Sequence, residues 1–224
     1  MISRLVVQTF VWFGVMGAVL FLSAGTLHWT GAWVYIVVMV GLSLTMGVAL
    51  ARRDPGLMNE RLRPPIQKTQ TAADKILLSI LLLGIFGWLA LMGFGVRFGW
   101  PAVPVWVQAV GALVLLVGIW ICYLTMLENS FAAPVVKIQK ERDQHVITTG
   151  PYSYVRHPMY AGAIFYFAGT ALLLGSWWGL ASVLFFIVLL AIRISIEENT
   201  LRTGLRGYDD YATNVRYRLI PLVW

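Results

Sequence analysis

The chain has 224 residues, of which 59% are hydrophobic and only 12% are charged, and its mean hydropathy is +0.76. Because soluble domains carry about 25% charged residues, this composition excludes an ordinary water-soluble domain and indicates a protein that lies in a lipid bilayer. The formal net charge is +7. The Lys and Arg residues are confined to loops and the C-terminal tail, which indicates contact with anionic lipid rather than with nucleic acid.

Six apolar runs predict an all-α, polytopic membrane bundle. A hydrocarbon core of about 30 Å takes about 20 helical residues to cross, and four runs reach this length: 5–22, 32–51, 76–96 and 104–127. The first run is longer than the apolar core of a signal peptide, about 7–15 residues, so we expect a retained span.

The last two apolar runs, 160–174 and 178–192, are shorter and are separated only by Gly175-Ser176-Trp177. We expect them to form a short helical hairpin whose ends return to the same side, giving five to six membrane segments. A cytoplasmic helix is expected in the C-terminal tail.

The distribution of charge predicts the orientation. With the N-terminus inside, all 17 Lys and Arg residues except Arg97 fall on the inner side, as do all ten acidic residues. This bias predicts cytoplasmic termini and a cytoplasmic active site. The single Cys122 excludes an intrachain disulfide, and the His residues lack metal-ligand spacing, so we expect no metal.

Two of the three main polar segments have ready structural interpretations. The basic loop 52–75 is typical of an inner loop that fixes topology and contacts lipid phosphate. In the segment 128–160, Gly150-Pro151 and His157-Pro158 interrupt helical structure. This segment is either a capped entry to the fifth apolar run or an irregular backbone that meets a ligand.

The third polar segment is the end of the sixth apolar run and the tail. Arg193 and Glu197 are four residues apart and share one helix face. They form either a plain ion pair at a helix end or part of a functional site, since an ionisable residue at the hydrocarbon boundary is costly.

Short motifs follow one another through this part of the chain: Thr149-Gly150-Pro151-Tyr152, Arg156-His157-Pro158-Met159-Tyr160-Ala161-Gly162, Glu197-Glu198, Tyr208-Asp209-Asp210-Tyr211 and Arg218-Leu219-Ile220-Pro221. In this order, with a hairpin between them, they resemble the isoprenylcysteine carboxyl methyltransferase-like family of integral membrane methyltransferases. Phospholipid N-methyltransferases share a similar pattern. The resemblance divides the chain into 1–127, the N-terminal transmembrane helices, and 128–224, a methyltransferase region.

The resemblance implies a cofactor, S-adenosyl-L-methionine, with S-adenosyl-L-homocysteine as its product. It places the substrate-contacting arginine at Arg193, which we take as the catalytic residue. The cofactor-binding residues that we predict from it are His145, Val146, Ile147, Gly150, Tyr152, His157, Pro158, Met159, Tyr160, Glu197 and Glu198. A carboxylate can accept hydrogen bonds from ribose hydroxyls or an ammonium, and tyrosines offer aromatic surface to the adenine or sulfonium.

The function we expect from the resemblance is carboxyl O-methylation of an isoprenylcysteine-like lipidic substrate at the cytoplasmic membrane face. The alternative is N-methylation of a phospholipid of the phosphatidylethanolamine type, which would need a base, with Glu198 and His157 as candidates. A more distant alternative is a non-catalytic lipid-binding or transport protein. The expected partners are the bilayer and a membrane lipid or lipid-modified small substrate, with neither nucleic acid nor metal.

Overall fold

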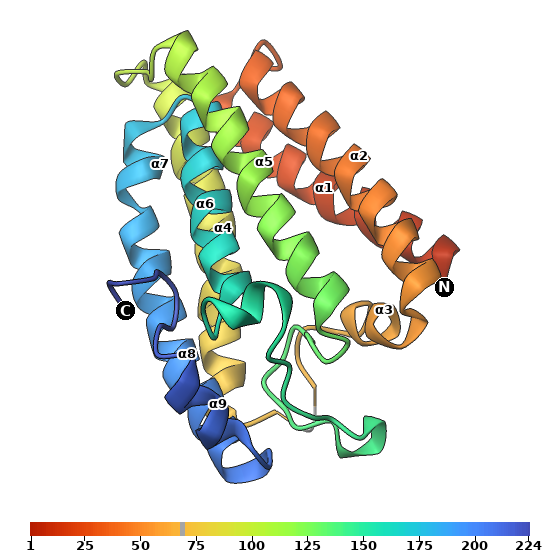
Figure 1. Cartoon of the computed structure of the whole chain (residues 1–224). Helices are drawn as coiled ribbons and strands as arrows, with labels where there is room; N and C mark the ends of the chain where they lie inside the picture. The colour runs from red at the N-terminus through yellow and green to blue at the C-terminus, as the bar shows by residue number, and fades with distance from the viewer. Residues whose placement is uncertain (68–69) are drawn as a thin grey trace.

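The computed structural model describes residues 1–67 and 70–224, and its regular structure within these ranges is helical (Figure 1). Lys68, one of the cations of the predicted inner loop, lies outside the described residues. The α-helices are α1 (Ile2–Ala24), α2 (Thr30–Arg53), α3 (Pro55–Arg61), α4 (Ala72–Arg97), α5 (Val105–Glu128), α6 (Pro158–Leu173), α7 (Trp177–Ala181), α8 (Val183–Gly204) and α9 (Tyr208–Asn214). Two 3₁₀ turns, η1 (Lys140–Arg142) and η2 (Gly150–Ser153), lie between α5 and α6.

In the described part of the chain, five helical stretches are long and apolar enough to cross a membrane. They are α1, α2, α4, α5 and the stretch Trp177–Gly204, which comprises α7 and α8. Helix α6 is apolar but shorter, at 16 residues. The predicted polytopic helical bundle is confirmed.

The predicted hairpin is formed by α6 and α7–α8. Its turn uses Gly175 with φ 78°, a conformation that favours glycine, and the Ser176 hydroxyl then accepts from Gly179 N at 2.9 Å to cap α7. The second arm is longer than expected, because the helix does not end at Ile192 but continues to Gly204. No Pro or Gly interrupts residues 193–203, and several polar side chains there find partners within the protein.

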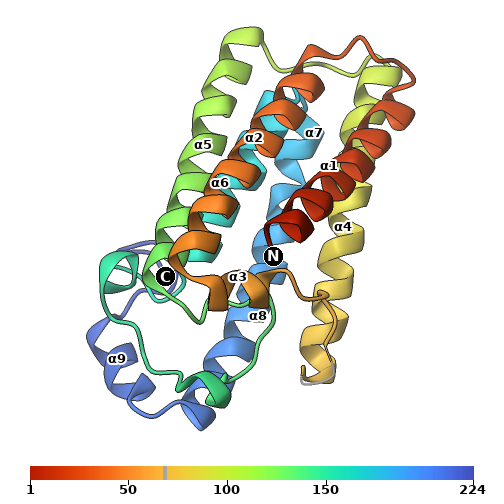
Figure 2. The ribbon, with the colours of Figure 1, turned by 90° about the vertical axis from the view of Figure 1, so that its right-hand side faces the viewer.

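The polar segments gather at one end of the bundle. Figures 1 and 2 show α3, the irregular segment 129–157 and α9 at this end, opposite the connections 25–29, 98–104 and 174–176. Regions far apart in the sequence therefore meet where the apolar helices stop.

Helices α5 and α6 pack with their backbones in close contact. A Cβ atom added at Gly118 would lie 2.5 Å from Tyr166 N, and one added at Gly169 would lie 2.2 Å from Leu115 N. Small residues allow such contact between membrane helices. The packing fixes the position of α6, whose first turn carries Met159.

Gly118→Ala is expected to lower the stability of the protein by at least about 1 kcal/mol, because the cost of overpacking exceeds the gain in helix propensity. The matched control is Gly14→Ala in α1, where an added Cβ meets nothing within 4 Å. The apparent melting temperature of the two variants in detergent checks the prediction. Equal shifts would contradict the role given to the α5–α6 contact.

Candidate functional site

A cavity of about 310 Å³ lies at the polar end of the bundle. Its walls come from α3, the segment 129–147, η2, the first turn of α6, the second half of α8, and α9. This volume is at the lower end of the range typical of small-ligand sites, about 300–1,000 Å³. The cavity thus joins the three polar segments that the sequence analysis treated separately.

Most of the predicted site residues line this cavity: His145, Val146, Ile147, Tyr152, His157, Met159, Tyr160, Arg193 and Glu197. Gly150, Pro158 and Glu198 are not among its lining residues. Gly150 begins η2 with φ 58°, and Pro158 begins α6, so these two shape the backbone beside the cavity.

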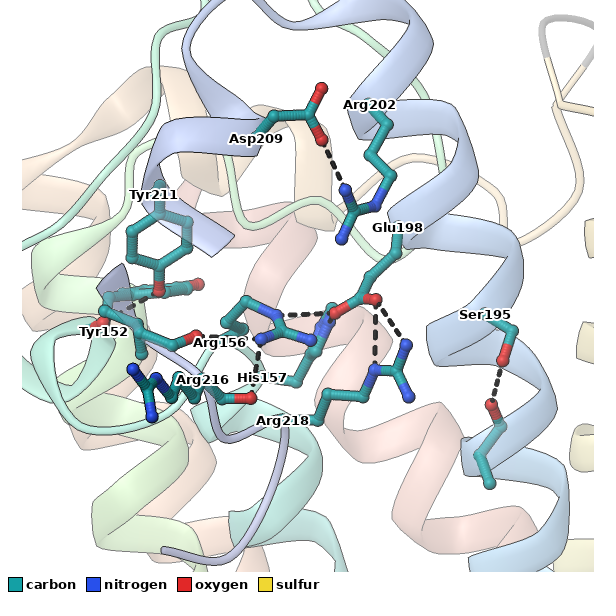
Figure 3. Close-up of polar contacts among 12 residues, drawn as sticks. Tyr152, Arg156, His157, Ser195, Glu198, Arg202, Asp209, Tyr211, Arg216 and Arg218 are labelled. Carbon is teal, nitrogen blue, oxygen red and sulfur yellow. Dashed lines mark hydrogen bonds and ion pairs between the residues drawn. The ribbon is translucent and has the colours of Figure 1, made fainter. Parts of the chain in front are cut away.

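The buried Glu198 carboxylate holds three basic side chains (Figure 3). Its Oε1 accepts from Arg156 Nε at 2.7 Å and lies 3.2 Å from His157 Nε2. Its Oε2 accepts from Arg218 Nε at 3.0 Å. Glu198 therefore compensates the charge of two arginines beneath the cavity wall, rather than facing into the cavity.

The same cluster fastens the C-terminal tail to the segment before α6. The backbone N–H groups of Arg156 and His157 donate to carbonyls of the tail, each at 2.9 Å, and Arg156 Nη1 donates to two more, each at 2.8 Å. The four accepting carbonyls belong to Tyr217, Arg218, Val215 and Arg216. The tail thus forms part of the support of the site.

Arg193 projects from α8 and is buried among three groups. Its Nε lies 3.4 Å from Asp74 Oδ1, its Nη2 donates to Pro134 O, and its guanidinium lies 5.9 Å from the centre of the Tyr160 ring. Neither Arg193 Nε nor Asp74 Oδ1 has a hydrogen-bond partner within the described ranges. An ion pair of Arg193 with Glu197, one reading of the sequence, is wrong: Glu197 Oε2 accepts instead from the Tyr160 hydroxyl at 2.5 Å.

Sequence reasoning missed Asp74, which is 0% exposed. Its Oδ2 accepts from Gln70 Nε2 at 2.8 Å and from Val136 N at 3.2 Å. Asp74 also lies three residues after Thr71, whose hydroxyl accepts from Asp74 N at the start of α4. That spacing resembles an ordinary helix-capping pattern and gave no signal of a contact with α8.

Three tyrosines line the cavity near α9: Tyr208 and Tyr211, which are buried, and Tyr152, which is partly buried. Tyr152 accepts from Asn129 Nδ2 at 2.7 Å, and the Tyr211 hydroxyl donates to Tyr152 O at 2.8 Å. The Tyr208 hydroxyl has no hydrogen-bond partner among the described residues. Burial raises the pKa of Tyr152, Tyr208 and Tyr211, so these phenols stay protonated and can donate to a ligand.

Parts of the chain are similar to known proteins. Residues 106–205 match the family model of the phospholipid methyltransferases. A stretch of 93 residues is 37% identical to the protein-S-isoprenylcysteine O-methyltransferase of Schizosaccharomyces pombe, covering 40% of this chain and 38% of the relative. A stretch of 70 residues is 41% identical to the protein of the same name from Saccharomyces cerevisiae, covering 30% of this chain and 28% of that relative.

The chain therefore spans less than two fifths of the length of the curated relatives it matches. The family-model match, residues 106–205, includes the motifs from Thr149 to Glu198, and the helical bundle is of the expected kind. The chain is thus similar in part of its length to the phospholipid methyltransferases and to two protein-S-isoprenylcysteine O-methyltransferases, which supports the resemblance carried by its motifs.

Proposed function

We propose that the protein uses S-adenosyl-L-methionine to methylate the carboxylate of an isoprenylcysteine-like lipidic substrate at the cytoplasmic membrane face. The observation that carries the proposal is the cavity in which Arg193, Glu197 and Tyr160 meet at the polar end of an apolar bundle. The names of the two yeast relatives support this class of acceptor. The excess of Lys and Arg in the loops at this end supports the cytoplasmic orientation.

The donors and acceptors around the cavity fit the cofactor. Glu197 has one hydrogen-bond partner among the described residues, Tyr160, which leaves carboxylate capacity for a ribose hydroxyl or an ammonium. Tyr208 offers an unpartnered hydroxyl, and Tyr152 offers aromatic surface. When bound, the cofactor supplies an activated methyl group on a positively charged sulfur.

We assign cofactor contacts to the predicted residues that line the cavity. All of these predicted residues lie in the proposed methyltransferase region, 128–224. Two other lining residues, Arg61 and Leu78, belong to the proposed N-terminal region, 1–127. The two regions would therefore build one site together.

The chemistry of a carboxylate acceptor suits this set of side chains. An α-carboxylate has an ordinary pKa of about 3.5, so it is ionised at neutral pH and needs no general base. Arg193 would orient the carboxylate, and positioning would be the main catalytic contribution. The apolar helices beneath the cavity offer a surface for the lipid tail.

N-methylation of a phospholipid is a second candidate, because the matching family model is that of the phospholipid methyltransferases. This reaction must first remove a proton from an ammonium. Both predicted bases are engaged: Glu198 accepts from two arginines, and His157 Nε2 faces Glu198. The carboxylate acceptor therefore has the stronger support, and a product assay separates the two, since methyl esters are labile to alkali and N-methyl groups are not.

Calorimetry with S-adenosyl-L-homocysteine tests the cofactor. Saturable binding to the wild-type protein is expected, and Glu197→Ala is expected to weaken it by about 10–100-fold, the usual worth of a hydrogen bond to a charged group. Glu141→Ala, at an exposed acid of η1, is the matched control and should bind as the wild type does. A folded wild-type protein that binds no cofactor would overturn the proposal and favour a non-catalytic lipid-binding or transport protein.

A further inference from the structure

Among the described residues, four Lys and Arg side chains line the cavity, and three of them have a carboxylate partner. Lys137 Nζ lies 2.7 Å from Glu60 Oε2, Arg156 Nε lies 2.7 Å from Glu198 Oε1, and Arg193 Nε lies 3.4 Å from Asp74 Oδ1. The fourth is Arg61, the last residue of α3. Each of the first three charges is therefore balanced before any ligand enters.

Arg61 has no carboxylate within 4 Å among residues 1–67 and 70–224. Its Nη1 donates to Ala132 O at 2.9 Å and contacts Met159 Sδ at 4.0 Å. The neighbouring acid, Glu60, is taken by Lys137 on one oxygen and by Arg63 on the other, at 2.7 and 2.9 Å. Among the described residues that line the cavity, Arg61 is thus the cation without a carboxylate partner.

The surroundings disfavour that charge. Arg61 is partly buried, and burial lowers the pKa of its guanidinium from the ordinary value. A buried charge without a counter-ion is costly, and an anion placed beside it relieves the cost. The environment of Arg61 is therefore suited to receive the anionic group of a ligand.

The position of Arg61 is fixed by packing. Asp54 accepts from Leu57 N at 2.8 Å to cap α3, and Leu57 and Met58 are buried in a cluster with Ala132. Met159, on the first turn of α6, packs against the same cluster. A side chain held in this way is preorganised, as a ligand contact requires.

We infer that Arg61 is an anion-binding residue of the cavity and binds a carboxylate of its ligand. The inference rests on the proposed function, in which both the cofactor and the acceptor carry such a group. It also gives a role to the basic loop 52–75 beyond topology and lipid contact. His157, another basic side chain of the lining, is less suited to bind a carboxylate, because its Nε2 faces Glu198.

Binding by Arg61→Met and by the wild type, measured by calorimetry with two pairs of probes, tests the inference. The first pair is S-adenosyl-L-homocysteine and S-adenosyl-3-thiopropylamine, which keeps the amine but lacks the carboxylate. The second pair is N-acetyl-S-farnesyl-L-cysteine and its carboxamide. The variant is expected to bind the carboxylate member of one pair at least about tenfold more weakly, with the uncharged member unaffected. The affected pair identifies the source of the carboxylate.

The matched control is Arg63→Met, which removes an exposed arginine two residues away. Unchanged affinity for both carboxylate probes, or an equal loss within both pairs, would overturn the inference. If Arg61→Met is not recovered folded, Arg61→Lys makes the same comparison, since lysine keeps the charge but lacks the planar fork of donors. Failure of the wild type to bind the nucleoside probes would count against the proposed function, and the acceptor pair would still test Arg61.

Discussion

Arg193→Ala is expected to reduce methyl transfer by at least about 100-fold while changing the affinity for S-adenosyl-L-homocysteine by less than about threefold. The guanidinium is held by Asp74, Pro134 O and the face of Tyr160, so its position is well defined. In the proposed function it orients the acceptor. Steady-state rates with a farnesylcysteine analogue, together with calorimetry of the nucleoside product, check both halves of the expectation.

The Arg193→Ala variant also leaves Asp74 buried without its counter-charge, which by itself destabilises a protein. The double variant Arg193→Met with Asp74→Asn removes both charges and separates the two effects. It is expected to be more stable than Arg193→Ala but equally inactive. Recovery of activity in the double variant would show that the single variant had failed through misfolding.

The matched control for Arg193 is Arg202→Ala. Arg202 lies on the same helix but is exposed and pairs with Asp209 outside the cavity lining. Its loss is expected to leave the rate within about twofold, since exposed ion pairs contribute little. A parallel loss of rate and nucleoside affinity in Arg193→Ala would instead place Arg193 in the cofactor site.

The sequence was sufficient to predict the membrane-spanning helices, because the length of an apolar run depends only on consecutive residues. The run 76–96 became α4, Ala72–Arg97, with only a few residues added at each end. The same reasoning underestimated α8, because hydropathy falls at Arg193 while the helix continues to Gly204 through a stretch that contains no Pro or Gly before its last residue. Composition therefore located the membrane segments but not the end of the helix that carries the site.

Most of the residues predicted from the motifs line the cavity, whereas the contacts between distant segments could not be predicted from the sequence. Asp74 and Arg193 are 119 positions apart (193 − 74), and no periodicity connects them. Local spacing left an ion pair of Arg193 with Glu197 as one of two readings, but Arg193 lies beside Asp74 and Glu197 accepts from the hydroxyl of Tyr160. The sequence did not single out Arg61, because the basic residues of an inner loop usually fix the orientation of the membrane spans.

Glu198→Ala is expected to destabilise the protein by about 3–5 kcal/mol, the usual cost of removing one partner from a buried ion pair. Arg156 of the segment before α6 and Arg218 of the tail would lose the carboxylate that they share. A chain of this length loses roughly 2–4 °C of melting temperature per kcal/mol, so a fall of roughly 6–20 °C is expected in detergent.

The neighbouring Glu197→Ala is the matched control, because its single described hydrogen bond is to Tyr160 and its side chain faces the cavity. It is expected to change stability by less than about 1 kcal/mol, the value of a typical hydrogen bond, while weakening the binding of S-adenosyl-L-homocysteine. The two adjacent variants are thus expected to differ: Glu198→Ala lowers stability, whereas Glu197→Ala weakens the binding of the nucleoside. If Glu198→Ala kept its melting temperature but lost nucleoside binding, Glu198 would be a cofactor ligand, as its motif implied, and the cavity would have to open toward it when the ligand binds.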